Sequence, residues 1–424
     1  MQRLKKGSIS NICKNLIVTF ASLLIFLLLA EAGSRILNLD SRNAQDKYLT
    51  SQDRFFFAVP INRKDPYLFW RLKPQARFGK LSVNSKGFRG KEFSEEKKSG
   101  TFRIMALGDS CTLGVGVADD ETYASVLANI VNKNAGYSRK YEVINAGVAG
   151  YSSLQGLRYL KAELIKYKPD VITVQFGFND YLYTGGPGDK DIHESSRFAI
   201  YLDDMLSKSR LYQFLKKRLE SLLSQKTTFP PNRRVDTLDF RKNLKEIISE
   251  ANKSGTVILL LNLPVRPDIP LVVNAIPIPE DDKNGRVIEW LRPAVIGGKN
   301  YYVESDFDGP ASVLEKSIEK YPQWSLAHYF LARKYESAGE KVKAEEEFKK
   351  AKETDIDRKV IAKYNTAIRE IAGEMSIPMA DLVSIFESKK DQNLFLDERH
   401  ISASAHAIIA EAIYGALRTN NLIE

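Results

Sequence analysis

IMALGDSCTLGVGV, residues 104–117, is the stretch that decides the fold. Its first part is an apolar run that ends at Gly108, and Asp109, Ser110 and Cys111 follow directly. A strand that is apolar at nearly every position is expected where helices cover both faces of a parallel sheet. Ligands of such sheets bind beyond the carboxyl ends of the strands. Ser110 therefore stands where a helix cap, a phosphate-binding turn or a catalytic nucleophile is expected.

Strand and helix patterns alternate from residue 101 onward. Apolar runs predict strands, amphipathic periodicity predicts helices, and their alternation predicts an α/β fold with a parallel sheet between helices. We expect residues 36–100, which are polar and aromatic, to form an extension that packs on this domain. The predicted strands are 102–108, 141–147, 170–177, 256–264 and 377–382, and the predicted helices are 122–134, 153–167, 238–253, 357–374 and 403–418.

Two segments interrupt the alternation, so that the predicted domain consists of 101–280 and 357–424. The first segment, 181–235, contains a glycine-rich loop and an amphipathic helical stretch. The second, 281–356, resembles a single tetratricopeptide repeat in its helical part. The positions that carry this resemblance are Leu331, Ala332, Tyr335, Gly339, Ala344, Phe348 and Ala351.

A lone repeat of this kind cannot bury its own apolar face. We therefore expect residues 324–356 to pack on the main domain or to bind a protein partner. A generic helical hairpin is the alternative interpretation, because short repeat patterns also arise by chance.

The composition indicates a folded, globular protein. Of the 424 residues, 43% are hydrophobic and 27% are charged, which is typical of globular domains. The net charge of +10 comes from interspersed residues, without the basic and aromatic platform of nucleic-acid-binding proteins. We expect no nucleic-acid partner, whereas an anionic membrane surface would suit the positive charge. The two cysteines, Cys13 and Cys111, form no CxxC pair, which excludes zinc-ribbon and thioredoxin-like sites.

The N-terminus carries an anchoring or targeting signal. Residues 16–30 are an apolar run, shorter than the about 20 residues that usually span a bilayer. Basic residues before such a run keep the N-terminus in the cytoplasm, so we predict a signal anchor over 1–35 with the rest of the chain exported, in the periplasm or outside the cell. AEA at 30–32 resembles a cleavage site, and a removed signal peptide is the alternative. The basic residues are Arg3, Lys5, Lys6 and Lys14.

Polar residues beyond the predicted strands supply the groups that acyl transfer needs. Ser110 is a poor nucleophile unless a base takes its proton, and His400 can be that base. Asp397, three residues earlier, can fix the tautomer of the imidazole and stabilise its positive charge. The N–H groups of Ser110 and Gly147 and the side-chain amide of Asn179 are the expected donors to the oxyanion of the tetrahedral intermediate.

These blocks make the chain resemble the SGNH/GDSL hydrolases, a superfamily named for the serine, glycine, asparagine and histidine of four sequence blocks. The resemblance covers about 101–185 and 355–418. It implies a flavodoxin-like three-layer α/β/α sandwich, and ester hydrolysis or acyl transfer through a serine acyl-enzyme. The blocks are GDS with Ser110, NAG with Gly147, GFND with Asn179, and DERH with Asp397 and His400.

Rival sites lack their required residues. A phosphate-binding loop needs a lysine and a dinucleotide-binding loop needs a third glycine, and both are missing after Gly108. No HExxH or comparable cluster suggests a metal site. We therefore expect neither a cofactor nor a metal.

Taken singly, the same residues have simpler interpretations. Ser110 could be a helix cap, Asn179 and Asp180 a turn, and Asp397 with His400 a surface loop. We expect Asp109 to be structural and leave the role of Asp180 open. Among the remaining candidates, we expect Cys111 to be a packing residue, His406 to be packing or exposed, and His193 and His328 to have no role.

The sequence thus predicts a membrane-anchored, exported serine esterase or O-acyltransferase. Its substrate would be an acyl ester, with acylated carbohydrates or lipids as the classes considered. Nothing in the sequence selects between water and a sugar hydroxyl as the acyl acceptor. The alternative is a non-enzymatic binding protein that uses a hydrolase-like fold and the repeat-like hairpin to engage a partner.

Overall fold

In the computed structural model the chain forms two compact units. One unit comprises Met1–Ser51 and Glu194–Pro230, and the other comprises Gln52–His193 and Pro231–Glu424. The structure describes residues 3–37, 61–135, 139–184, 188–192, 196–206, 209–224, 232–267, 269–271, 311–320, 322–389 and 392–423.

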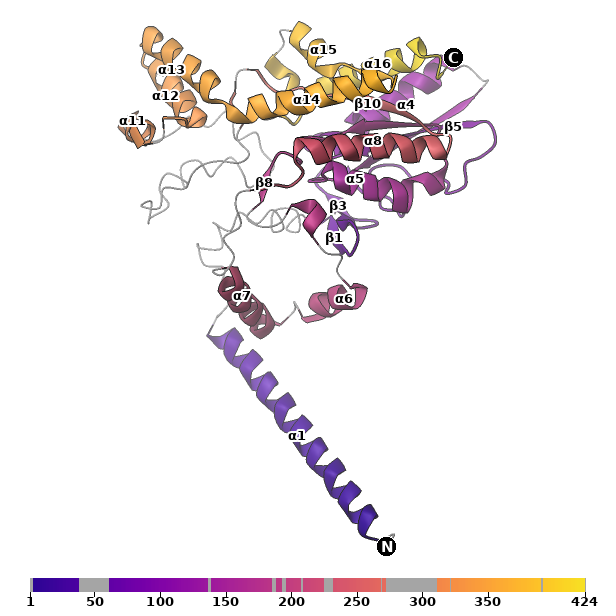
Figure 1. Cartoon of the computed structure of the whole chain (residues 1–424), viewed down its shortest axis with the longest axis vertical. Helices are drawn as coiled ribbons and strands as arrows, with labels where there is room; N and C mark the ends of the chain where they lie inside the picture. The colour runs from indigo at the N-terminus through magenta and orange to yellow at the C-terminus, as the bar shows by residue number, and fades with distance from the viewer. Residues whose placement is uncertain are drawn as a thin grey trace. The chain divides into compact units, whose positions relative to one another are not determined.

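A five-stranded parallel sheet forms the centre of the larger unit (Figure 1). Its order, β11-β10-β7-β5-β6, is the flavodoxin-like arrangement, in which the second strand along the chain lies outside the first. In register, Gly108 pairs with Gly147 on one side and with Gln175 on the other, so the carboxyl ends of three strands lie level. The strands are β5 (Thr101–Gly108), β6 (Lys140–Gly147), β7 (Val171–Gln175), β10 (Val257–Leu261) and β11 (Met379–Ala380).

Helices cover both faces of the sheet, which confirms the α/β prediction. Successive residues of β5 alternate between two cores: Met105 and Leu107 belong to one, Ile104 and Ala106 to the other. The first core contains α5 (Ser153–Tyr159), α8 (Thr237–Lys253) and α14 (Ile356–Glu374), and the second contains α4 (Tyr123–Asn134), α15 (Leu382–Ser388) and α16 (Ala403–Thr419).

The α-helix predicted over 153–167 is shorter than expected. It continues after Tyr159 as a π turn (Leu160–Leu164) and a 3-10 turn (Ile165–Tyr167). Lys168 then takes a left-handed conformation with φ +50°. The following residue is a proline, which disfavours helical geometry in the residue before it.

Residues 61–100 pack on the ends of β5 and β6. They form two antiparallel hairpins, β1 (Asn62–Asp65) with β2 (Phe69–Leu72) and β3 (Arg77–Phe78) with β4 (Leu81–Ser82). Trp70 donates its indole N–H to the carbonyl oxygen of Ala149 at 3.0 Å. The buried Arg89 guanidinium donates to the carbonyl oxygens of Leu113, Gly114 and Val117.

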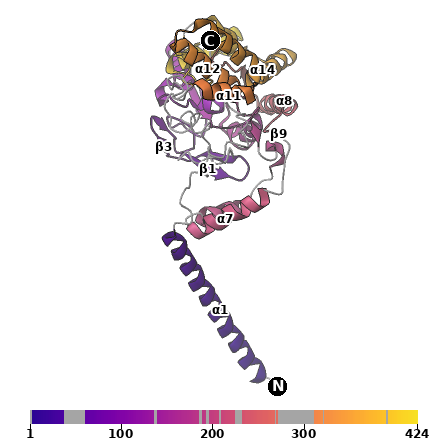
Figure 2. The same ribbon diagram turned by 90° about the vertical axis from the view of Figure 1, so that its left-hand side faces the viewer.

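The second interrupting segment contains three helices, α11 (Ala311–Lys320), α12 (Ser325–Ser337) and α13 (Lys341–Thr354). Figure 2 shows α11 beside α12. The described residues of this segment have a small core of their own that includes Trp324 and Phe330. Gly339 turns the chain between α12 and α13 with φ +78°. A helical pair therefore exists where the repeat resemblance lies, while the assignment as a tetratricopeptide-like repeat stays a prediction. Residues 281–310 lie outside the described part of the chain.

The smaller unit contains α1 (Arg3–Ile36), α6 (Arg197–Leu206) and α7 (Arg210–Ser224). Among the described residues, Lys14–Ile36 is the one helical segment long and apolar enough to cross a membrane, with a mean hydropathy of 2.3. The single amphipathic stretch predicted after residue 200 is two helices, because the chain breaks helical geometry around Ser209. In the larger unit, β8 (Tyr183–Thr184) and β9 (Asn232–Arg233) form a short antiparallel pair that brings the two ends of the first interrupting segment together.

Candidate active site

Three predicted residues form one hydrogen-bonded chain at the carboxyl edge of the sheet. His400 Nε2 lies 2.9 Å from Ser110 Oγ, and His400 Nδ1 lies 2.6 Å from Asp397 Oδ2. The serine and the histidine are 290 residues apart in the sequence. The carboxylate, imidazole and hydroxyl are therefore arranged for the proton to pass from Ser110 to His400.

A tight turn holds the aspartate and the histidine together. Asp397 Oδ1 accepts the backbone N–H groups of Arg399 at 2.9 Å and His400 at 2.6 Å. The N–H of Leu396 donates to the carbonyl oxygen of His400 at 2.7 Å. The three-residue spacing thus lets one carboxylate close the turn with one oxygen and orient the imidazole with the other.

Ser110 begins a short helix, α3 (Ser110–Leu113), directly after β5. Asp109 is the cap of this helix, because its side chain accepts the N–H of Cys111 at 2.9 Å. The interpretation of Ser110 as the cap is therefore wrong. Gly108 permits the sharp change of direction, since a Cβ there would lie 2.1 Å from Thr112 Oγ1 and 2.8 Å from the carbonyl oxygen of Gln175.

Asn179 lies beside Asp109. Its amide nitrogen donates to Asp109 Oδ2 and to the carbonyl oxygen of Tyr151, both at 3.1 Å. Asp180, whose role the sequence left open, points away into the fold and accepts the N–H and the hydroxyl of Ser153. Burial raises the pKa of Asp180 to about 7, although these hydrogen bonds oppose the shift. Asp180 thus has a structural role, because it holds the first residue of α5.

Gly147 occupies a packing position, not the donor position that the sequence predicted. Its N–H donates to Asn145 Oδ1 at 3.0 Å and is therefore already paired within the domain. A Cβ at this position would lie 2.2 Å from the backbone nitrogen of Leu113. The glycine is therefore required because α3 packs directly on β6. Asn145 also donates to the carbonyl oxygens of Thr112 and Leu113, which ties α3 to the strand.

Burial and charge act in opposite directions on the pKa values of His400 and Asp397. Burial lowers the pKa of His400, but the Asp397 carboxylate outweighs burial and the net pKa is raised. Burial raises the pKa of Asp397, but His400, Arg399 and the turn N–H groups hold it well below its ordinary value. Asp397 is therefore anionic across the range in which His400 exchanges its proton.

With this geometry in place, comparison with known proteins identifies the family. Residues 106–304 match the family of GDSL-like lipases and acylhydrolases. This domain belongs to the GDSL-like lipase/acylhydrolase family. The protein is accordingly a hydrolase of ester bonds. The match includes Ser110 and Asn179 and ends before Asp397 and His400, which the fold returns to the same sheet edge.

Solved structures resemble this chain at low identity. The acetyl xylan esterase AlAXEase is 14% identical, with 74% of this chain and 100% of that chain covered, at a TM-score of 0.37. The lipase/acylhydrolase from Enterococcus faecalis is 14% identical, with 75% and 96% covered, at 0.37. A catalytic mutant of the acetylxylan esterase Axe2 from Geobacillus stearothermophilus is 13% identical, with 74% and 94% covered, at 0.37. No curated protein matches the chain.

Two charged residues of the DERH block, Glu398 and Arg399, escaped sequence reasoning. Glu398 is buried, and burial together with Asp397 raises its pKa. Arg399 Nε lies 3.7 Å from Glu398 Oε1, and the buried Nε and Nη1 atoms have no hydrogen-bond partner among the described residues. A positive charge therefore lies beside His400 and lowers its pKa. The sequence does contain a signal for them, because two charged residues stand between Asp397 and His400.

Cys111 and His406 lie outside the hydrogen-bonded chain of Ser110, His400 and Asp397. Cys111 is buried, and burial raises its pKa well above the ordinary value, which suits a packing residue. His406 is fully buried, which excludes the exposed alternative, and its Nδ1 accepts the N–H of Tyr123 at 3.2 Å. Burial lowers the pKa of His406 to about 3. His193 lies outside the described residues.

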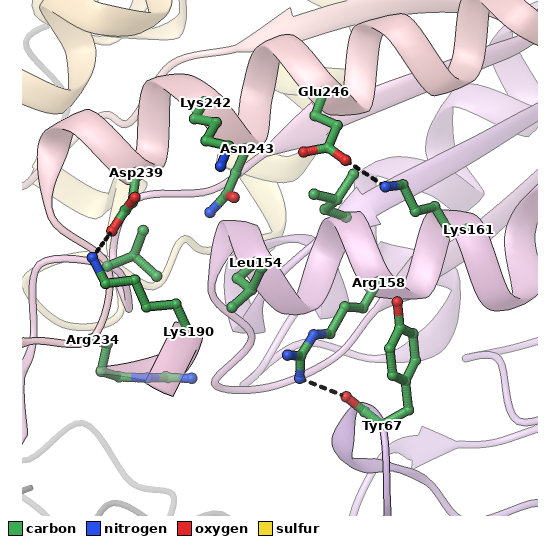
Figure 3. A pocket seen from close by; sticks show the side chains of 12 residues that line it. Tyr67, Leu154, Arg158, Lys161, Lys190, Arg234, Asp239, Lys242, Asn243 and Glu246 are labelled. Atoms are coloured by element: carbon green, nitrogen blue, oxygen red, sulfur yellow. Dashed lines mark hydrogen bonds and ion pairs between the residues drawn. The ribbon is translucent and has the colours of Figure 1, made fainter. Parts of the chain in front are cut away.

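A separate cavity of about 270 Å³ opens between α5 and α8 (Figure 3). Figure 3 shows Lys190 paired with Asp239 and Lys161 paired with Glu246 across its walls. Ser110, Asp397 and His400 do not line it. Arg234 lines this cavity, and its guanidinium donates to the carbonyl oxygen of Gly150 and to Asp189, which fixes its position in the domain. Among the described residues, no group of three or more histidines, cysteines or carboxylates could hold a metal ion.

Proposed function

We propose that this protein is a membrane-anchored, exported serine esterase of the SGNH/GDSL type, with Ser110, His400 and Asp397 as its catalytic triad. The observation that carries the proposal is the continuous hydrogen-bonded chain from Asp397 Oδ2 through both ring nitrogens of His400 to Ser110 Oγ. A serine hydroxyl with this partner is an activated nucleophile. Ser110 is partly exposed, so a substrate can reach it.

The proposed reaction has two steps. Ser110 Oγ forms a bond to the acyl carbon while His400 Nε2 takes the hydroxyl proton. The tetrahedral intermediate then collapses, the ester C–O bond breaks, and His400 returns the proton to the leaving alcohol. Water, or another hydroxyl in an acyl transfer, attacks the acyl-enzyme in the same way and regenerates Ser110. Asp397 stays ionised and stabilises the imidazolium.

For the oxyanion we propose the N–H of Ser110 and the amide of Asn179. Ser110 is the first residue of α3, and the first N–H groups of a helix have no partner within that helix. Asn179 would exchange one of its two 3.1 Å partners for the acyl oxygen. In place of Gly147 we propose Gly150, which is buried, has φ +80° and precedes Tyr151, the residue whose carbonyl oxygen Asn179 contacts.

The contacts of Glu31 support an anchor that remains attached. Glu31 accepts hydrogen bonds from the hydroxyl of Ser209 at 2.7 Å and from the N–H groups of Arg210 and Leu211 at 3.2 and 3.0 Å. Cleavage after Ala32 would remove Glu31 and leave the start of α7 without this partner. We therefore propose that α1 stays in the membrane and that the hydrolase unit is exported.

The substrate proposed is an acyl ester of a carbohydrate or a lipid. A panel of esters that differ in acyl chain length and in alcohol would identify the class, and products formed with a carbohydrate acceptor would separate hydrolysis from transfer. A protein partner for residues 324–356 stays a prediction.

Ser110→Ala tests the proposal with Ser404→Ala as its matched control, because Ser404 is an exposed serine near the same edge. On nitrophenyl acetate we expect Ser110→Ala to lower kcat by at least about a thousandfold and Ser404→Ala to leave it unchanged. Circular dichroism would establish that both variants fold. Full activity of a folded Ser110→Ala variant would overturn the assignment.

A further inference from the structure

The helix α6 exposes an apolar stripe. Phe198, Tyr201, Leu202 and Met205 are 72%, 66%, 36% and 50% exposed. Their spacing of three, four and seven residues places them on one face of the helix. Side chains of this size are seldom left in water as a group, and contiguous apolar patches mark a surface that meets another phase or another molecule.

The neighbouring helix α7 has a similar stripe and basic side chains. Leu215 and Leu219, one turn apart, are 55% and 59% exposed, whereas Lys216 and Arg218 carry positive charge on the same helix. Asp203 of α6 accepts hydrogen bonds from Tyr212 and Lys216 of α7. Polar contacts therefore hold the two helices together, while the apolar side chains of the two stripes remain exposed.

The hydrogen bonds of Glu31 fix where this helix pair begins. Glu31 lies near the carboxyl end of the apolar segment Lys14–Ile36, and it binds the backbone at the start of α7. A carboxylate is costly in the hydrocarbon core of a bilayer, so in a spanning α1 Glu31 stands at the interface. The first turn of α7 is then at the same depth.

We propose that α6 and α7 lie in the membrane–water interface, with their apolar stripes in the boundary between headgroups and acyl chains and their basic residues against anionic headgroups. This proposal rests on the membrane anchor proposed for α1. Amphipathic helices with basic polar faces bind membranes in this manner, about 5–10 Å below the headgroup level. The interface would then hold the unit at three places, namely α1, α6 and α7.

Spin labels in the full-length protein test this placement. Single cysteines replace Tyr201, Leu219 and Leu238 in separate variants that carry Cys13→Ala, and the buried Cys111 is retained. Leu238 is the matched control, a leucine of α8 that is 79% exposed. The protein is reconstituted in phosphatidylcholine vesicles with about a third phosphatidylserine. Collision of the labels with oxygen, which partitions into lipid, is compared with collision with a water-soluble nickel chelate.

We expect the oxygen-to-nickel accessibility ratio at positions 201 and 219 to exceed that at 238 about tenfold, because the first two lie in lipid. Nickel accessibility equal to that of position 238 would overturn the proposal, since the stripes would then face water. Protection from both reagents would also overturn it, since protein would then cover the stripes.

A fourth label, in place of Leu23, separates this proposal from the anchor. Oxygen accessibility at position 23 without lipid contact at 201 and 219 refutes the interfacial helices but keeps the anchor. Absence of lipid contact at position 23 refutes both. In the variant Glu31→Ala, the label at 219 should lose its lipid contact while the label at 23 keeps it, because Glu31 is what places α7 at that depth.

Discussion

Two histidine–carboxylate pairs in the larger unit look alike and differ in one partner. At the sheet edge, His400 Nδ1 lies 2.6 Å from Asp397 and Nε2 lies 2.9 Å from the hydroxyl of Ser110. In the helical insertion, which is the segment that contains α11, α12 and α13, His328 Nδ1 lies 2.5 Å from Glu347. His328 Nε2 lies 3.0 Å from the carbonyl oxygen of Pro322. One pair faces a group that can give up a proton, and the other faces a group that can only accept one.

This difference shows what a buried histidine–carboxylate pair needs in order to act as a base. Both partners of His328 are acceptors, so neither can give a proton to the imidazole, and the pair joins α12 to α13. His400 has one acceptor and one hydroxyl, so its Nε2 can take the proton of Ser110. His328 and Glu347 therefore serve as controls for substitutions of His400 and Asp397.

The largest expected effect is that of the histidine itself. We expect His400→Ala to lower kcat on nitrophenyl acetate by about 10⁴-fold, because no base remains. His328→Ala should leave kcat unchanged and lower the unfolding free energy by about 1–3 kcal/mol, because Glu347 loses its partner. Steady-state kinetics and thermal unfolding of both variants measure this. Equal losses of activity would remove the distinction between the pairs.

The carboxylates should separate the pairs almost as far. Asp397→Asn keeps the shape of the side chain but no longer stabilises the imidazolium or fixes its tautomer, so kcat should fall by about 10³–10⁴-fold. Glu347→Gln is the matched change in the insertion and should affect stability only. An active Asp397→Asn enzyme would show that the short hydrogen bond to His400 is structural.

The oxyanion donor comes next. We expect Asn179→Ala to lower kcat by about 10²–10³-fold with little change in KM, because the amide acts on the transition state. Asn365→Ala is the control: Asn365 is also buried, and its side chain exchanges hydrogen bonds with the backbone of Leu263. That variant should lose stability and keep its kcat. A KM effect alone in Asn179→Ala would contradict a transition-state role.

Two glycines distinguish a steric requirement from a conformational one. Gly147→Ala places a methyl group against the backbone of Leu113 and should lower the unfolding free energy by about 3 kcal/mol or more. Gly339→Ala, between α12 and α13, meets open space and has only a positive φ, so it should cost about 1 kcal/mol. Chemical denaturation would measure both values. A Gly147→Ala enzyme as stable as the wild type would contradict the steric requirement.

The smallest effect is a shift in pH dependence. His400 acts as a base only when neutral, so activity should rise with pH through its pKa, which is above the ordinary value. Arg399 lowers that pKa, so Arg399→Gln should raise it further and move the acid limb of kcat/KM to higher pH by about one unit. Arg333→Gln, an exposed arginine of α12, should cause no shift. An unchanged limb in Arg399→Gln would show that the charge is compensated by Glu398.

The parallel sheet and the edge that carries the site could be predicted from the sequence, because both follow from the order of apolar residues along the chain. The five strands are apolar because both faces of the sheet are covered, and their carboxyl ends therefore had to share one edge. That reasoning brought Ser110, Asn179, Asp397 and His400 to one place. It needed no knowledge of the long insertions, which leave the sheet edge and return to it.

What depends on tertiary contacts could not be predicted. Gly147 and Gly150 are equivalent in the sequence, and only the packing of α3 on β6 shows which one is sterically required. The break between α6 and α7 carries no proline or glycine, and its partner, Glu31, is distant in the chain. The hairpins of residues 61–100 are too short for a period of two to be recognised.

Labelling by a fluorophosphonate tests the central claim most directly, because this probe reacts only with a serine that a neighbouring base activates. The wild-type protein should be labelled, and mass spectrometry should locate the adduct on Ser110. His328→Ala should be labelled at the same rate, whereas His400→Ala should be labelled at least about a thousandfold more slowly. An unlabelled wild-type protein, or an adduct on any other serine, would contradict the account.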